Sequence, residues 1–322
     1  MLRTFTILAL VLTLAQAPCA AAKAPPTPEQ PPTVTVGYRK VEGERVMIPT
    51  NDGSGRLLAA NVFRPVTPGP RPMIILNHGY APSPDERKDF AVPVFDAITG
   101  FLVANGYVVV LPRRRGYGPG DSVLNETSDC RNIDFARDGI ETARDIEATL
   151  EFMSKQHYIN KDHIVVMGHS GGGWGSLAIV SLNLKGVRAA INLSGGRRCH
   201  QDGSNDEKSF IADLSRQKLV EASAIYGTKS RVPTLWIYAA NDRNRTPQQI
   251  AAMREAFEKA GGKAELLMLP PIGSDGHDTI SRREIVTQWF PRVYTFLKEV
   301  EREAKRNNPL AETKSPNTTL AR

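Results

Sequence analysis

The sequence has no apolar run long enough to cross a lipid bilayer. Its longest mostly apolar stretch, residues 5–14, contains ten residues, whereas a membrane-spanning helix needs about 20. Arg3 precedes the stretch and three alanines, residues 20–22, follow it. This order is typical of a secretory signal peptide. We therefore expect residues 1–22 to be removed on export to the periplasm or the medium, with a membrane anchor as the disfavoured alternative.

Cysteine is scarce, with three in the chain, and cleavage after Ala22 would remove Cys19. Lipidation of Cys19 is a minor alternative, because Pro18 precedes it where a small residue is expected. Cys130 and Cys199 would remain. In an oxidising compartment an even pair of cysteines predicts one disulfide. Two separate buried thiols are the alternative.

Metal and cofactor motifs are lacking as well. No cysteine or histidine cluster has the spacing of metal ligands, and no nucleotide-binding glycine motif follows an expected strand. We therefore expect neither a metal nor an organic cofactor. The 41 Lys and Arg residues exceed the 34 Asp and Glu residues, for a net charge of +7. They are scattered along the chain, which argues against nucleic acid as partner. A basic surface equally suits acidic substrates or an anionic membrane face.

What is present is ordinary globular composition, with 41% hydrophobic and 23% charged residues. Five prolines mark residues 23–33 as an extended linker. Residues 307–322 are polar and contain two prolines, which predicts a disordered tail. Residues 34–306 are then expected to form one catalytic domain.

Short apolar runs alternate with helical patterns across this domain. Continuous apolar runs of this length suit strands buried on both faces of a parallel sheet. The alternation predicts an α/β fold, with a doubly wound, mostly parallel sheet flanked by helices. Ligands of such sheets bind at the carboxyl ends of the strands. The expected strands are 45–48, 57–63, 73–76, 108–111, 164–167, 189–193, 234–239 and 266–269, and the expected helices are 134–156, 172–184, 247–260 and 284–305.

The strongest motif is Gly-His-Ser-Gly-Gly at residues 168–172, which has the form G-x-S-x-G. It lies between an expected strand and an expected helix, which is the context that a nucleophilic serine on a sharp turn requires. Small neighbours let the backbone turn tightly. The positive end of the following helix favours a developing oxyanion. Ser170 is the predicted nucleophile.

A serine hydroxyl needs a base to activate it. His277 lies in a polar, glycine-rich loop after the last expected strand, from which it can reach over the strand ends. His200 is the one rival, since its loop also comes close to the expected site. His169 is the variable residue of the serine motif and is expected to pack beside it.

Asp242 is the predicted acid that orients the base. It follows the expected strand 234–239 directly. A surface aspartate paired with Arg243 or Arg245 is the alternative. For the oxyanion, the backbone N–H of Gly171 is one expected donor. The N–H of Tyr80, in the loop after strand 73–76, is the other.

Together these residues resemble the α/β-hydrolase superfamily over roughly residues 45–302. Three segments, His78-Gly79-Tyr80, residues 115–118 and the serine motif, are most similar to its dienelactone-hydrolase and prolyl-oligopeptidase-like branches. The order Ser, Asp, His along the chain agrees. The chain departs from the first branch in having serine where its usual members have cysteine. It departs from the second because the sequence leaves no room for a propeller domain.

The resemblance implies that the Arg-Gly-Tyr-Gly segment, with Arg115 and Tyr117, borders the substrate. We expect loops 113–130 and 194–208 to line the pocket. Arg197 or Arg198 is expected to bind a carboxylate or another acidic group, because arginine matches that shape with two parallel hydrogen bonds. A solvated loop or an internal salt bridge is the alternative.

Three function classes follow from these residues. Hydrolysis of a small carboxylic ester is the first, because compact members of this fold without an added domain often act on small esters. Peptidase or amidase activity on a peptide substrate is the second, because of the Arg-Gly-Tyr-Gly segment. A catalytically silent binding protein is the third. All predicted triad and oxyanion positions are present, which argues against it.

Overall fold

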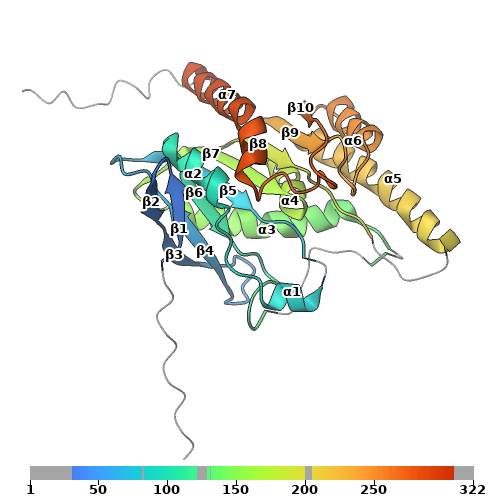
Figure 1. Cartoon of the computed structure of the whole chain (residues 1–322), viewed down its shortest axis with the longest axis horizontal. Helices are drawn as coiled ribbons and strands as arrows, with labels where there is room; N and C mark the ends of the chain where they lie inside the picture. The colour runs from blue at the N-terminus through green and yellow to red at the C-terminus, as the bar shows by residue number, and fades with distance from the viewer. Residues whose placement is uncertain (1–30, 82, 122–128, 131, 200–204, 308–322) are drawn as a thin grey trace, which may run out of the picture. The chain divides into compact units, whose positions relative to one another are not determined.

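The computed structural model describes residues 31–307, apart from residues 82, 122–128, 131 and 200–204 (Figure 1). The described residues form a two-stranded hairpin, an eight-stranded sheet and seven helices. The strands are β1 (Thr33–Val36), β2 (Arg39–Glu42), β3 (Glu44–Pro49), β4 (Leu57–Phe63), β5 (Arg71–Asn77), β6 (Val108–Pro112), β7 (Ile159–His169), β8 (Val187–Leu193), β9 (Pro233–Ala239) and β10 (Lys263–Leu269). The helices are α1 (Pro84–Lys88), α2 (Asp96–Ala104), α3 (Phe135–Met153), α4 (Gly171–Val180), α5 (Asn205–Lys229), α6 (Pro247–Lys259) and α7 (Arg283–Asn307).

The main sheet has the strand order β10-β9-β8-β7-β5-β6-β4-β3. The strands from β10 to β6 are parallel, while β4 near one edge is antiparallel to both of its neighbours, β6 and β3. The chain adds β6 on one side of β5 and then crosses over to add β7 on the other side, so the strand order reverses at β5. At the end of this pair Asn77 faces Gly168. A reversal of this kind opens a crevice at the carboxyl ends of the strands.

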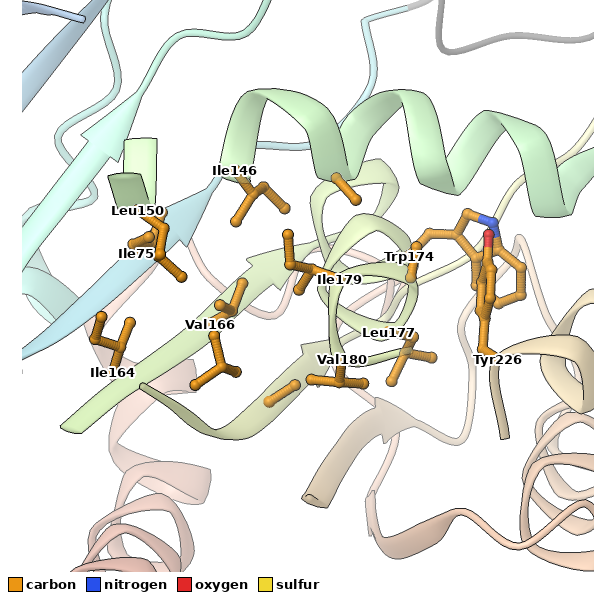
Figure 2. Packing of buried hydrophobic residues seen from close by; sticks show 14 of the residues in the cluster. Ile75, Ile146, Leu150, Ile164, Val166, Trp174, Leu177, Ile179, Val180 and Tyr226 are labelled. Atoms are coloured by element: carbon orange, nitrogen blue, oxygen red, sulfur yellow. The ribbon is translucent and has the colours of Figure 1, made fainter. Parts of the chain in front are cut away.

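Helices cover both faces of the sheet, as the alternating pattern predicts. Residues of α3, α4, α5 and α6 pack in one apolar core against one face. Residues of α2 and α7 pack in a second core against the other face. In Figure 2, Leu150 of α3 lies beside Ile75 of β5, and Ile179 and Val180 of α4 lie near Val166 of β7. The fold is therefore that of the α/β hydrolases, and all eight predicted strands of the main sheet are present.

Three helices and the hairpin were not predicted, and α5 is the largest of them. Residues 194–208 were expected to be a loop, yet α5 begins at Asn205. Its buried side chains recur at helical spacing but include the small polar Ser215 and Ser223. Such a stripe carries little hydrophobic periodicity and escapes a search for amphipathic helices. No helix within the described ranges is both long enough and apolar enough to cross a membrane.

The boundaries of the expected domain shift slightly. β1 begins at Thr33, the last residue of the predicted linker. At the other end α7 reaches Asn307, the first residue of the predicted tail. The predicted signal peptide and the rest of the tail lie outside the described residues.

Candidate active site

The serine motif forms a sharp turn between β7 and α4. Ser170 joins them with φ 54° and ψ −118°. The left-handed region is costly for a residue with a side chain, and such strain is typical of a nucleophile held on a tight turn. Gly172 makes the turn possible, because a Cβ there would lie 2.4 Å from the carbonyl oxygen of His78. The turn therefore brings Ser170 against the end of β5.

Ser170, His277 and Asp242 form a continuous hydrogen-bonded chain. Ser170 Oγ lies 3.0 Å from His277 Nε2. His277 Nδ1 lies 3.1 Å from each carboxylate oxygen of Asp242. An ionised carboxylate only accepts hydrogen bonds. The proton of the neutral imidazole therefore sits on Nδ1, and Nε2 is left to accept the serine proton.

Asp242 is buried at the end of β9. Burial alone would raise the pKa of its carboxyl group. The hydrogen bond from His277, the electrostatic attraction of His277 and Arg245 and the N–H of Asn244 outweigh that effect and hold the pKa below its ordinary value. Asn244 donates to Oδ1 at 2.8 Å. Asp242 therefore stays ionised while it faces His277, and its burial argues against the alternative of a surface aspartate.

The residues predicted to hold an oxyanion surround Ser170. Gly171 is the first residue of α4, where backbone N–H groups have no partner within the helix. A Cβ on Gly79 would lie 3.3 Å from Ser170 Cβ, and a Cβ on Gly171 would lie 3.2 Å from Tyr80 Cβ. The turn after β5 and the first turn of α4 therefore enclose the serine from two sides.

Arg197 lies beside the same turn, whereas Arg198 points outward. The guanidinium of Arg197 is buried, 5.6 Å from the centre of the Tyr80 ring. One of its terminal nitrogens would lie 3.1 Å from a Cβ on Gly171, and the other donates to Thr142 at 2.8 Å. Arg198 is exposed and interacts electrostatically with Asp242 and Asp275. Of the two candidates, only Arg197 is placed next to Gly171.

Residues 93–303, more than half of the chain, match the model of the prolyl oligopeptidase family. The chain belongs to the prolyl oligopeptidase family. No curated protein has a significant sequence match to it. The family match and the hydrolases among the similar structures support a serine hydrolase.

Solved structures with this fold include peptidases and esterases. Dipeptidyl peptidase 4 of Porphyromonas gingivalis has a TM-score of 0.61 at 17% identity, over 81% of this chain and 36% of that one. A puromycin-hydrolysing peptidase of Mycobacterium tuberculosis has 0.60 at 15%, over 81% and 39%. An esterase of Pyrococcus furiosus has 0.57 at 18%, over 84% and 99%. The chain thus spans little more than a third of the two peptidases but nearly all of the esterase.

In this family member Arg115 was predicted to border the substrate, but its guanidinium binds two carboxylates of the protein instead. Its Nε donates to Asp145 Oδ1 at 2.5 Å, and its backbone N–H donates to the other oxygen at 2.9 Å. A third bond joins its guanidinium to Asp52 at 3.0 Å. Arg115 is buried where it neutralises Asp145 of α3 and Asp52 of the turn between β3 and β4. The prediction that it contacts substrate is replaced by a role in joining these elements.

Tyr117 is also buried, in place of the predicted position at the edge of the pocket. Its ring packs edge-on against His78 at 4.5 Å and against Phe90 at 5.2 Å. The apolar ring gains more from this packing than from solvent exposure. Tyr117 therefore supports the turn after β5 from behind and is not a substrate contact.

Cys130 and Cys199 are free thiols in this structure, which differs from the predicted disulfide. They are nevertheless neighbours. Burial raises the pKa of the Cys199 thiol, and a hydrogen bond with Cys130 raises it further. The segments that carry Cys130 and Cys199 therefore meet at these two sulfurs, as the predicted bridge requires.

His169 was expected only to pack beside the serine, and it does more. Its Nε2 donates to the backbone carbonyl of His277 at 2.8 Å. Burial is the main cause that lowers the pKa of His169 to about 4, so the ring is neutral near pH 7. Its position between Gly168 and Ser170 is the only sequence signal that could have identified it. His200, the rival base, lies outside the described residues.

Proposed function

We propose that the chain is a serine hydrolase in which Ser170 attacks a carbonyl carbon, His277 is the base and Asp242 orients it. The observation that carries the proposal is the hydrogen-bonded chain from Ser170 Oγ through His277 to both oxygens of Asp242, on a strained turn at the crevice of the sheet. Nucleophile, base and orienting acid need this geometry.

The mechanism proceeds by acyl transfer. His277 Nε2 takes the proton from Ser170 Oγ as the oxygen bonds to the substrate carbonyl carbon. The backbone N–H groups of Gly171 and Tyr80 hold the resulting oxyanion. The tetrahedral intermediate collapses, and the leaving group takes the proton from His277. Water, deprotonated by His277, then attacks the acyl-enzyme and releases the acid together with free Ser170.

Carboxylic esters are the first proposed substrate class, and peptides or amides are the second. The esterase of Pyrococcus furiosus is covered almost completely by this chain, which favours esters. The match to the prolyl oligopeptidase family favours peptides. An amide leaving group needs better protonation by His277, so a matched ester and amide separate the two classes.

The test compares the mature protein with Ser170→Ala on a short-chain nitrophenyl ester and a nitroanilide with the same acyl group. Loss of the nucleophile should lower turnover by several powers of ten. Turnover of the ester alone supports an esterase, and comparable turnover of the anilide supports a peptidase. Equal rates for Ser170→Ala and the parent protein would overturn the proposed nucleophile. If neither substrate is cleaved, absence of labelling by a serine-reactive phosphonate would do the same and favour the binding protein.

The proposed substrate carries an acidic group on its acyl side, bound by Arg197. The support is the position of its guanidinium beside Gly171 and Tyr80, the two residues proposed to hold the oxyanion next to Ser170. A buried guanidinium is well suited to recognise a carboxylate, since it stays charged and presents paired donors. Binding through Arg198 is the rival, and an internal role for Arg197 is the alternative.

Arg197→Met and Arg198→Met distinguish these cases on two esters that differ only in a terminal carboxylate. A hydrogen bond to a charged group contributes about 1.5–3 kcal/mol, so Arg197→Met should lower kcat/KM for the acidic ester about 10- to 100-fold more than for the neutral one. A selective loss in Arg198→Met would transfer the role to Arg198. Equal losses on both esters would remove the acidic substrate from the proposal.

Export to the periplasm or the medium is proposed on the apolar stretch and alanines of residues 1–22. The natural host should release a mature protein that begins near Lys23, which amino-terminal sequencing would detect. A cytoplasmic protein that retains Met1 or Leu2 would contradict export.

A further inference from the structure

The turn after β5, residues 78–80, is supported on its far side by a buried arginine. Arg114 follows β6, the parallel neighbour of β5, and its guanidinium is almost completely shielded from solvent. One terminal nitrogen donates to the carbonyl of His78 at 2.6 Å, and the other donates to the carbonyl of Gly79 at 3.3 Å. A guanidinium can bind two adjacent carbonyls in this way because its donors form a rigid, planar fork.

His78 adds a further bond to the same peptide. Its Nε2 accepts the backbone N–H of Arg114 at 3.1 Å, so the proton of the neutral ring lies on Nδ1. Nδ1 lies 2.7 Å from the carbonyl oxygen of Gly79 and donates to it. Phe90 and Tyr117, each with its ring centre 4.5 Å from that of His78, hold the imidazole in place. Two donors therefore hold the Gly79 carbonyl from one side.

The direction of this carbonyl determines the direction of an N–H. The carbonyl of Gly79 and the N–H of Tyr80 belong to one planar, trans peptide, so they point in opposite directions. Arg114 lies on the carbonyl side, while Ser170 and Gly171 lie close to Gly79 and Tyr80. A rotated peptide would instead turn the partial negative charge of the carbonyl toward the forming oxyanion.

We propose that Arg114 is a positioning residue for catalysis, which keeps the Gly79–Tyr80 peptide in the orientation that directs the Tyr80 N–H at the oxyanion. His78 acts with it through the Nδ1 proton. The inference rests on the proposed serine hydrolase function, because it concerns the second oxyanion donor of that reaction. It assigns to the segment 113–115 a function distinct from the predicted substrate contact of Arg115.

The experiment compares Arg114→Met and Arg114→Lys with Arg113→Met as a matched control. Arg113 adjoins Arg114 and also donates to a carbonyl, that of Phe90 at 3.1 Å, but not to residues 78–80. Steady-state kinetics on the nitrophenyl ester are combined with the affinity for a trifluoromethyl ketone, which forms an oxyanion on Ser170, and for the carboxylic acid product, which does not. Circular dichroism and thermal unfolding verify that each variant is folded.

Arg114→Met should lower kcat about 10- to 1000-fold, with KM nearly unchanged, because outright loss of an oxyanion donor lowers kcat about 100- to 1000-fold. Affinity for the ketone should fall by a similar factor, while affinity for the product stays within about threefold. Arg114→Lys should fall between the parent and Arg114→Met, because one ammonium cannot bind both carbonyls in the same geometry. If Arg114→Met does not fold, the lysine variant carries the test.

Equal losses of ketone and product affinity, or the same kcat in Arg114→Met and Arg113→Met, would assign Arg114 a structural role only and overturn the inference. Failure of the proposed function is recognised separately, because Ser170→Ala would then retain ester turnover.

Discussion

His169 Nε2 donates a hydrogen bond to the backbone carbonyl of His277, and the atoms lie 2.8 Å apart. The residue before the proposed nucleophile therefore holds the loop that carries the proposed base. The ring centres of the two histidines are 5.1 Å apart. Two segments that are far apart in the sequence are joined at the point where a proton would move between them.

The first prediction concerns this bond. His169→Phe keeps a planar ring but removes the donor to the His277 carbonyl, so the imidazole of His277 should sample orientations that do not face Ser170. We expect kcat for ester hydrolysis to fall about tenfold or more, since small misplacement of a catalytic group is costly. His169→Gln, which can still donate, should retain more activity. Equal kcat in both variants and the parent would contradict the positioning role.

The second prediction concerns the pH dependence of stability. The pKa of His169 is about 4 in the folded protein and 6.5 ordinarily, so between these values the unfolded chain binds more protons. The contribution of the neutral His169 to the free energy of unfolding is fully present above pH 6.5. It is lost as the pH falls toward 4, by about 1 kcal/mol per pH unit. Asp145 contributes with the opposite sign, because burial raises its pKa to about 6 despite Arg115.

Comparison of the parent with His169→Phe isolates the histidine contribution. The free energy of unfolding of both proteins is measured with denaturant at pH 7.0, 6.0 and 5.0. As the pH falls, the parent should lose stability relative to His169→Phe. A difference independent of pH would show that His169 does not titrate in this range.

The third prediction concerns Arg115. Arg115→Met leaves the buried carboxylate of Asp145 without its main partner, which typically costs about 3–5 kcal/mol. We expect thermal unfolding at a markedly lower temperature, with KM of the remaining folded enzyme unchanged for both acidic and neutral esters. Asp145→Leu in the same protein should restore part of the stability. A rise in KM at parental stability would return Arg115 to the substrate pocket.

The fourth prediction concerns the neighbouring thiols of Cys130 and Cys199. Oxidised glutathione should convert them into a disulfide through a mixed disulfide, with release of reduced glutathione, and more rapidly at high pH because the pKa of Cys199 is raised. A covalent link between the segments that carry Cys130 and Cys199 should stabilise the protein by about 2–4 kcal/mol. Cys130→Ser is the control. Two thiols that remain open to alkylation after this treatment would contradict the pairing.

The sequence alone determined the positions of the strands in the main sheet and the residues after these strands that carry the proposed chemistry. Strands buried on both faces must be continuous apolar runs, so each could be located, and β4 was predicted with the observed ends. Gly172 contacts the end of β5 so closely that only glycine fits. This requirement is visible in the sequence, because Gly172 is the last residue of the serine motif. Ser170, Asp242 and His277 each follow a strand, and parallel strands end at one edge of the sheet.

Only the tertiary structure decided what the polar side chains around that edge contact. Arg115 looked like a pocket residue, but it turns inward because Asp145 and Asp52 lie within hydrogen-bonding distance. Arg114, its neighbour in the sequence, binds the carbonyls of His78 and Gly79 instead. Hydrophobic periodicity cannot distinguish the roles of Arg114 and Arg115. The partner of a buried charge comes from a distant segment, and the packing of the sheet and helices determines which segment that is.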